Sequence, residues 1–256
     1  MNVINLKTVR NIRDFGGIVN KEGRRIKEHC FIRSAALDSL SKDELKKLTD
    51  TYRLKTVIDL RTNLEKEEKP DAINDDINYY HLPPVDELIA GLTHENAADK
   101  KAILDNIPDM PELYRKVANN ETAVSQMKKV FEVIVNAKDG EAVLWHCSEG
   151  KDRCGITSAL LLSLLDVDRE TIFEDYLYTN KVAHKRATKM AALVFLVTRD
   201  RIKTKQVWYA FAADRSFLEA AFDEMEKRNG SVEKFLEESL GITKEMKENF
   251  KNRFLE

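Results

Sequence analysis

Short apolar runs alternate with helical patterns along much of this chain. Four runs have the length of strands and lie at residues 30–34, 54–60, 77–82 and 142–146. Helical spacing covers residues 121–137 and resumes at Ile156. Because strands that alternate with helices form a parallel sheet covered on both faces, this order predicts an α/β fold with a central, mostly parallel sheet flanked by helices.

Local turn and cap signals add detail to this picture. Residues 15–19 and 25–27 flank the segment 20–23 (NKEG), which predicts a hairpin turn. The spacing of Ser41 and Glu44 is that of a capping box and predicts the start of a helix.

Two stretches differ from the alternating pattern. Residues 84–120 are polar and interrupted by prolines, with helical patches at 86–92 and 111–117, and such a long connection predicts a helical lid or binding loop. Residues 169–256 are almost entirely helical in pattern, with stops at Gly230 and Gly241. We see no linker or repeat, so we expect residues 1–256 to form a single domain with a helical C-terminal extension.

Composition narrows the class of protein. Lys and Arg number 42 against 44 Asp and Glu, so the net charge of −2 gives no reason to expect a nucleic-acid partner. No apolar run approaches the roughly 18 residues of a membrane span, and the first residues lack a signal-peptide pattern. Three cysteines do not suggest a disulfide framework. We therefore expect a cytoplasmic protein, with export without a signal peptide left open.

The segment 146–155 (HCSEGKDRCG) contains the clearest candidate chemistry. It follows the apolar run 142–145 and precedes the helical run 156–165, so Cys147 ends a buried strand and Arg153 begins a helix. A strand–loop–helix unit directs backbone N–H groups and a helix N-terminus at one point, which makes an anion site. A cysteine at that point would have a stabilised thiolate and act as a nucleophile.

A phosphate monoester fits this arrangement. Cys147 would attack phosphorus and form a phosphocysteine, which water would hydrolyse, while Arg153 holds two oxygens in a bidentate fork. Gly150 allows the backbone to approach the ligand, and His146 is expected to hydrogen-bond the backbone near Cys147. No metal or other cofactor is needed. The predicted phosphate-binding residues are Ser148, Glu149, Gly150, Lys151, Asp152 and Arg153.

The leaving group needs a proton, so a carboxylic acid must lie nearby. Asp152, inside the loop, ranks first, although it could merely cap the following helix. Asp59 ranks second because it ends the strand at 54–60, where active sites of such sheets lie. An ion pair between Asp59 and Arg61 is the interpretation we favour for those two residues. For Lys151, a solvated charge and a substrate contact are equally plausible.

The loop resembles the signature of cysteine-dependent tyrosine and dual-specificity phosphatases, His-Cys-x-x-Gly-x-x-Arg-x-Gly. Its Gly150-Lys151-Asp152-Arg153 version is similar to that of the bacterial tyrosine-protein/lipid phosphatase family. Further similar segments spread the resemblance over nearly the whole chain: 11–17, 33–37, 59–65, 175–180, 217–222 and 230–232.

This resemblance implies a phosphatase-type α/β fold without a cofactor and a general acid at Asp152. It associates Lys151 with phosphoinositide as well as phosphotyrosine substrates, and it implies a helical lid over the site, where residues 84–120 fit. The implied partners are a phosphorylated protein or a phosphoinositide, with inorganic phosphate as product.

Cys154 departs from the family pattern, which has Ser or Thr after the arginine. That hydroxyl helps to stabilise the thiolate and speeds hydrolysis of the phosphocysteine, and a thiol is a weaker donor. We therefore expect either slower turnover or a redox role, in which Cys154 forms a reversible disulfide with Cys147.

The sequence thus predicts a phosphomonoesterase that acts on phosphotyrosine, with phosphoserine, phosphothreonine or phosphoinositide as further candidate substrates. One alternative is a catalytically weak phosphate-binding module that shields phosphorylated partners. Another is sulfur or arsenate chemistry, which also uses cysteine loops, although the resemblance over the whole chain disfavours it.

Overall fold

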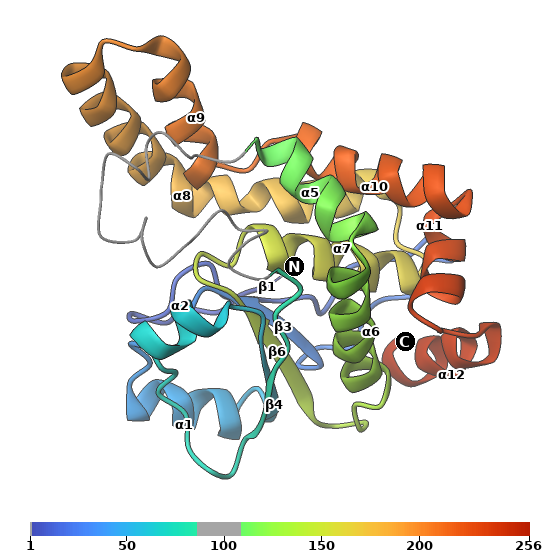
Figure 1. Ribbon diagram of the computed structural model, residues 1–256. Helices are drawn as coiled ribbons and strands as arrows, with labels where there is room; N and C mark the ends of the chain where they lie inside the picture. Colours follow the sequence, from blue (N-terminus) through green and yellow to red (C-terminus); the bar gives the residue numbers. More distant parts are fainter. Residues whose placement is uncertain (1, 86–108) are drawn as a thin grey trace.

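A mixed sheet lies at the centre of the protein, whose computed structural model describes residues 2–85 and 109–256 (Figure 1). Strands β3, β6, β4 and β5 are parallel in that order, and β2 and β1 extend the β3 edge antiparallel. The strands are β1 (Asn2–Val3), β2 (Arg13–Asp14), β3 (Phe31–Ser34), β4 (Leu54–Asp59), β5 (Asn78–His81) and β6 (Ala142–His146). The predicted mostly parallel α/β sheet is confirmed.

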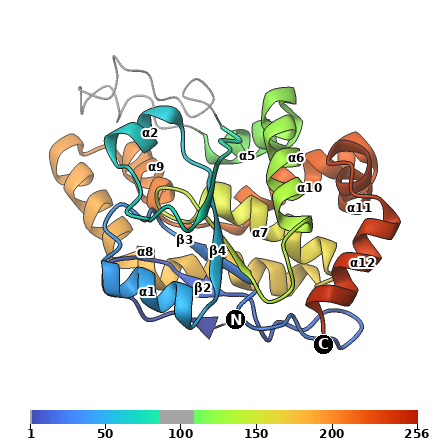
Figure 2. The ribbon, with the colours of Figure 1, turned by 90° about the horizontal axis from the view of Figure 1, so that it is seen from below.

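Helices cover this sheet (Figures 1 and 2). Those before the loop at residues 147–151 are α1 (Lys42–Asp50), α2 (Asn63–Glu68), α5 (Met110–Asn119) and α6 (Glu121–Val135). The helices after the loop are α7 (Asp152–Leu164), α8 (Arg169–Thr198), α9 (Arg201–Phe211), α10 (Arg215–Asn229), α11 (Val232–Lys234), a π-helical turn (Phe235–Ser239) and α12 (Lys244–Phe254).

Successive side chains of β6 point to opposite faces of the sheet and divide the core into two layers. Val143 and Trp145 face a large apolar cluster formed with α5, α6, α7 and the C-terminal helices. Ala142 and Leu144 face a smaller cluster that includes Leu48 of α1. Because β6 is buried along its whole length, it holds the loop that follows on a rigid base.

Most expected elements appear within a few residues of their predicted bounds. The turn at 20–23 is flanked only by an isolated bridge between Val19 and Arg25, so strands do not extend from it. The predicted helical patch at 111–117 is α5, whereas the patch at 86–92 lies outside the described residues.

The C-terminal extension is helical, as expected, and its first two helices form a hairpin. The first part of α8 packs against α7 in the core, whereas its C-terminal part pairs with α9 in a hairpin that extends away from the sheet (Figures 1 and 2). Within residues 2–85 and 109–256, no helix has both the length and the apolar character needed to cross a membrane.

Candidate active site

The loop 147–151 joins the carboxyl end of the central strand β6 to the N-terminus of α7. Gly150 has a φ of +65°, and a Cβ there would lie 2.6 Å from the Ser34 carbonyl group, so the turn requires glycine. Helix α7 begins at Asp152, and the N–H groups of its first turn have no acceptor within the helix. The loop and this helix end therefore form the predicted strand–loop–helix unit.

Cys147 is buried and has an activated thiol. The Cys154 side chain, opposed by burial and helped by the charge of Arg153 and the Cys154 backbone N–H, lowers the pKa of Cys147 to about 6. The Cys154 Sγ also lies 3.6 Å from the Ser34 carbonyl oxygen and 3.8 Å from that of Trp145. The pKa of Cys154 itself is raised well above its usual value, mainly by burial, so it stays a thiol that can donate.

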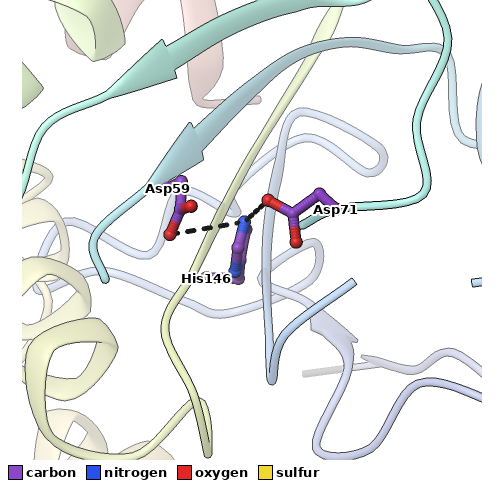
Figure 3. Close-up of side chains that lie close together, drawn as sticks. All are labelled: Asp59, Asp71 and His146. Carbon is purple, nitrogen blue, oxygen red and sulfur yellow. Dashed lines mark ion pairs between the residues drawn. The ribbon is translucent and has the colours of Figure 1, made fainter. Parts of the chain in front are cut away.

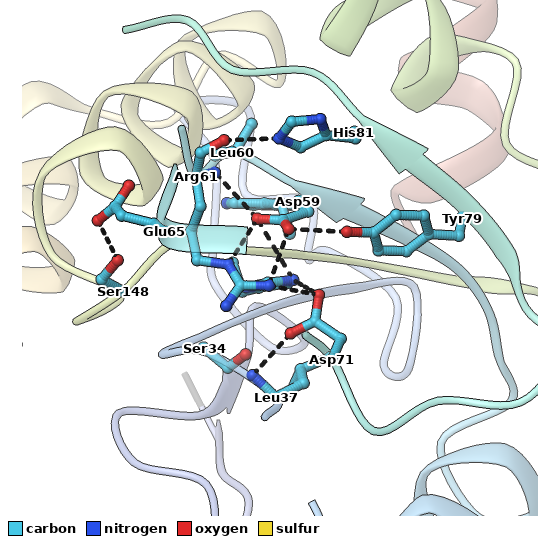
Figure 4. Close-up of polar contacts among 12 residues, drawn as sticks. Ser34, Leu37, Asp59, Leu60, Arg61, Glu65, Asp71, Tyr79, His81 and Ser148 are labelled. Carbon is cyan, nitrogen blue, oxygen red and sulfur yellow. Dashed lines mark hydrogen bonds and ion pairs between the residues drawn. The ribbon is translucent and has the colours of Figure 1, made fainter. Parts of the chain in front are cut away.

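Arg153 is held by a carboxylate from another element, Glu65 of α2 (Figure 4 shows its carboxylate against Ser148). Its Nη2 donates to Glu65 Oε1 at 2.9 Å, its Nη1 bonds to the other oxygen, and the Leu60 carbonyl lies 3.2 Å from Nη1. Burial alone would raise the pKa of Glu65, but Arg153 and Ser148 outweigh it and lower this pKa to about 2. Glu65 is thus a carboxylate that fixes the guanidinium beside the loop.

A capping box explains how Glu65 reaches this place. Thr62 is the N-cap of α2, its hydroxyl accepts from the Glu65 N–H, and the Glu65 carboxylate accepts from the Thr62 N–H at 2.9 Å. The same carboxylate therefore caps α2 and binds Arg153. The spacing of Thr62 and Glu65 was a signal for the cap in the sequence, but nothing in it indicated Arg153 as a partner.

Asp152 faces two tyrosines, Tyr114 of α5 and Tyr176 of α8. The Tyr114 hydroxyl donates to Asp152 Oδ1 at 2.7 Å, and the Tyr176 hydroxyl lies 2.7 Å from that of Tyr114. The Asp152 side chain is 28% exposed. The N-cap position of α7 belongs to Lys151, and the Asp152 carboxylate accepts from Tyr114, so the alternative that Asp152 merely caps the helix does not describe its position.

Lys151 is buried rather than solvated. Its Nζ donates to the carbonyls of Tyr209, Ala210 and Ala212 at 2.9–3.1 Å, and lies 3.4 Å from Asp152 Oδ1. The interpretation of Lys151 as a solvated charge is wrong, because the C-terminal end of α9 supplies its carbonyl partners. The lysine thereby ties the catalytic loop to the α8–α9 hairpin.

A buried charge network fixes the far side of the loop. Arg33 Nη2 donates to the Gly150 carbonyl at 2.8 Å, and its Nη1 to Asp175 at 2.6 Å. Arg13 binds the other oxygen of Asp175 at 2.8 Å, and Asn11 donates to the Gly150 carbonyl at 3.0 Å. Burial would raise the pKa of Asp175, but the two arginines hold it below the ordinary value.

His146 lies behind the loop, against two buried carboxylates (Figure 3). Its Nε2 is 3.0 Å from Asp71 and 3.8 Å from Asp59, and neither contact has hydrogen-bond geometry. Neither ring nitrogen has a hydrogen-bond partner among the described residues, so the predicted bond from His146 to the backbone near Cys147 is wrong. The imidazole turns instead toward the negative charge of Asp71.

Asp59 and Arg61 form the favoured ion pair. Nε and Nη2 of Arg61 each donate to Asp59 at 2.9 Å, and the Tyr79 hydroxyl donates to the same carboxylate at 2.7 Å (Figure 4). Burial would raise the pKa of Asp59, but its bonds to Arg61 and the nearby His146 lower it. Asp59 is fully buried and acts here as a partner of Arg61.

Asp59, Asp71 and His146 also offer one ligand atom each within metal-binding distance of one another. Nη2 of Arg61, however, lies 2.9 Å from a carboxylate oxygen of each aspartate. The guanidinium therefore already supplies a positive partner for both carboxylates, and the cluster is explained as a charge network that supports the loop.

The sequence profile of the tyrosine phosphatase family matches residues 4–256. The chain belongs to the tyrosine phosphatase family. This phosphatase is 28% identical over 243 residues to a candidate tyrosine-protein phosphatase of Cupriavidus necator, over 92% of the chain and 83% of that relative. A tyrosine-protein phosphatase of Nostoc commune is 32% identical over 150 residues, 57% of the chain and 47% of the relative.

Two further matches are partial or distant. Triple specificity protein phosphatase PtpB of Mycobacterium tuberculosis is 29% identical over 85 residues, 33% of the phosphatase and 30% of the relative. The structure of P. aeruginosa TpbA in complex with pTyr superposes with a TM-score of 0.33 at 16% identity, over 60% of this chain and 70% of that one. The family and the names of the first relatives place the enzyme among the protein-tyrosine phosphatases.

The phosphatase brings most of the predicted site residues together around one loop. Glu149 is the exception, because its half-exposed carboxylate pairs with Arg10 and Arg186 at the rim of the loop. A cavity of about 410 Å³ adjoins this rim and is lined in part by Ser148, Glu149 and Glu65. The contacts that sequence reasoning missed are those of Glu65, Asp71 and Tyr114, which reach the loop from distant segments.

Proposed function

We propose that the phosphatase hydrolyses phosphotyrosine through a phosphocysteine intermediate formed on Cys147. The observation that carries this proposal is a buried thiol with a pKa of about 6, placed at a helix N-terminus and near the Arg153 guanidinium. A thiolate at neutral pH attacks phosphorus, the tyrosine oxygen leaves, and water then releases inorganic phosphate from the sulfur.

One edge of the Arg153 guanidinium group is available to bind the substrate. Its contacts to Leu60, Glu65 and Ser148 all use the two terminal nitrogens, and the one to Ser148 is long at 3.4 Å. A phosphate oxygen can displace that long contact while a second oxygen binds Nε–H. Together with the N–H groups at the start of α7, this arrangement stabilises the charge on the transferred phosphoryl group.

Asp152 is our candidate for the general acid. Its carboxyl group is partly exposed beside the loop, whereas Asp59 is sealed behind it by Arg61 and Tyr79. We expect Asp152→Asn to slow phenyl phosphate, which has a poor leaving group, about 10²- to 10⁴-fold, with a much smaller effect on p-nitrophenyl phosphate. Asp59→Asn with that leaving-group dependence, and Asp152→Asn without it, would reverse the assignment.

We extend the proposed substrate range beyond phosphotyrosine. One relative is named as a triple specificity phosphatase, and the cavity at the loop rim carries side chains of both charges. We include phosphoserine, phosphothreonine and phosphoinositides as candidate substrates on these grounds. Relative kcat/KM values for a phosphotyrosine peptide, a phosphoserine peptide and a soluble phosphoinositide decide among them.

The alternative, a module that only shields phosphorylated partners, predicts binding without turnover. Hydrolysis of p-nitrophenyl phosphate by the unaltered enzyme, abolished in Cys147→Ser, supports catalysis. A phosphotyrosine peptide that binds and is never hydrolysed would instead support shielding.

A further inference from the structure

The tip of the α8–α9 hairpin exposes aliphatic side chains. Val197 is 84% exposed, Ile202 73% and Leu196 60%, and Leu193 lies on the same part of α8. They surround a turn with regular caps: Arg199 closes α8 in the left-handed conformation, and Asp200 accepts from two N–H groups of α9. The tip is therefore an ordered turn that presents apolar side chains.

Packing within the hairpin does not require these residues. Ala187, Ala191 and Val194 form the buried face of α8 at this end, and Val207 is the buried residue of α9. The exposed aliphatic side chains lie on other faces of the two helices. Both views show the tip of the hairpin lying away from the sheet (Figures 1 and 2).

The hairpin also concentrates positive charge. Residues 181–205 contain eight Lys or Arg and one acidic residue, Asp200, in a chain whose net charge is −2. The exposed basic side chains of this segment are Lys181, Lys185, Arg186, Lys189, Arg199, Arg201 and Lys205. A positive surface with an apolar tip is complementary to a bilayer that contains anionic lipids, in which acyl chains lie beneath phosphate groups.

We propose that the tip of this hairpin docks on anionic membranes. Leu196, Val197 and Ile202 enter the boundary between headgroups and acyl chains, and Arg199 and Arg201, which flank them at the tip, bind lipid phosphates. An isolated nucleic-acid strand would use the positive charge but not the aliphatic tip, so charge and apolar surface together favour a bilayer. This surface binds independently of the proposed catalytic mechanism.

The hairpin is connected to the catalytic loop. Lys151 of that loop holds the carbonyls of Tyr209, Ala210 and Ala212 at the base of α9. A docked hairpin would therefore place the loop at a defined position relative to the membrane surface.

Flotation of the full chain with phosphatidylcholine vesicles, with and without phosphatidylserine, tests this proposal. We expect binding only when phosphatidylserine is present. The double variant Val197→Asp with Ile202→Asp should lower binding at least about tenfold, and the double charge reversal Arg199→Glu with Arg201→Glu at least about 25-fold. Hydrolysis of soluble p-nitrophenyl phosphate should be unchanged in both variants.

Matched controls lie on other elements. Val3→Asp changes another exposed valine, and Lys42→Glu with Lys46→Glu changes two lysines of α1, so neither should reduce vesicle binding. Equal binding to both kinds of vesicle, or tip variants that bind like the unaltered chain, would overturn the proposal. Binding of the tip to a protein partner instead of to the vesicles would also count against it.

Discussion

At the scale of single residues, Cys154 occupies the position where the family resemblance led us to expect a hydroxyl. Its side chain and its backbone N–H both contribute to the lowered pKa of Cys147, while its Sγ also lies close to the Ser34 and Trp145 carbonyls. A weaker donor than a hydroxyl is thus still sufficient for activation. A reversible disulfide between Cys147 and Cys154 stays a prediction.

Cys154→Ala should raise the pKa of Cys147, because it removes the side-chain donor to the thiolate. Alkylation by iodoacetamide follows the thiolate, so its rate in the unaltered enzyme should increase with pH and be half-maximal near pH 6. The midpoint should shift to higher pH in Cys154→Ala and much less in Cys154→Ser, which keeps a donor. The same midpoint in Cys154→Ala as in the unaltered enzyme would show that Cys154 does not stabilise the thiolate.

Glu65→Gln should lower kcat/KM for p-nitrophenyl phosphate by about 10- to 100-fold, because hydrogen bonds to charged groups contribute about 1.5–3 kcal/mol. Arg153 would lose its charged bidentate partner and its fixed orientation. Glu67→Gln, on the exposed end of the same helix, is the matched control. Equal losses in the two variants would show that α2 and not the Arg153 contact is responsible.

The sequence predicted the contacts of some site residues but not those of others. Spacing alone indicated Cys147, Arg153 and the ion pair between Asp59 and Arg61, because these partners lie close together in the chain. Glu65 lies 88 residues from Arg153, and Tyr114 lies 38 from Asp152. Such contacts depend on how the strands are ordered, which one sequence does not reveal.

At the scale of elements, the apolar runs predicted the strands and helices well because each run is a local pattern. The order β3-β6-β4-β5 results from pairings between distant segments, so only the parallel arrangement could be expected. The hairpin formed by α8 and α9 was not predicted, because the stops seen in the helical pattern of residues 169–256 lie at Gly230 and Gly241. The direction of α9 depends on the left-handed Arg199 and on the anchor at Lys151.

Asp175 joins three elements, because it binds Arg13 of β2 and Arg33 of β3 from within α8. Asp175→Asn leaves two buried arginines without their counter-charge and should lower the free energy of unfolding by about 3–5 kcal/mol. Urea unfolding measures this loss, and exposed Asp223→Asn is the control. A change in Asp175→Asn no larger than the control would show that the network is not needed for stability.

The same network predicts a pH dependence. The pKa of Asp175 is lower in the folded than in the unfolded chain, so its stabilising effect is present above the ordinary aspartate range. This contribution is lost as the pH falls through the folded pKa. The difference in unfolding free energy between the unaltered chain and Asp175→Asn should therefore shrink as the solution is acidified below that range.

At the scale of the whole molecule, charge is distributed unevenly. The hairpin carries the net positive segment, while the rest of the chain is acidic, and the catalytic loop lies at the base of that hairpin. Composition alone gave a nearly neutral protein and concealed this asymmetry. Because α8 and α9 pack against each other, the basic residues of this segment form one positively charged surface.

Trapping the reaction intermediate tests the central claim most directly. The enzyme is mixed with a phosphotyrosine peptide labelled with radioactive phosphate, quenched with an alkaline denaturant within one turnover, and digested at alkaline pH for mass spectrometry. The account predicts a labelled phosphocysteine at Cys147 that disappears as inorganic phosphate is released. Label on any other residue, or undiminished turnover by Cys147→Ser, would contradict it.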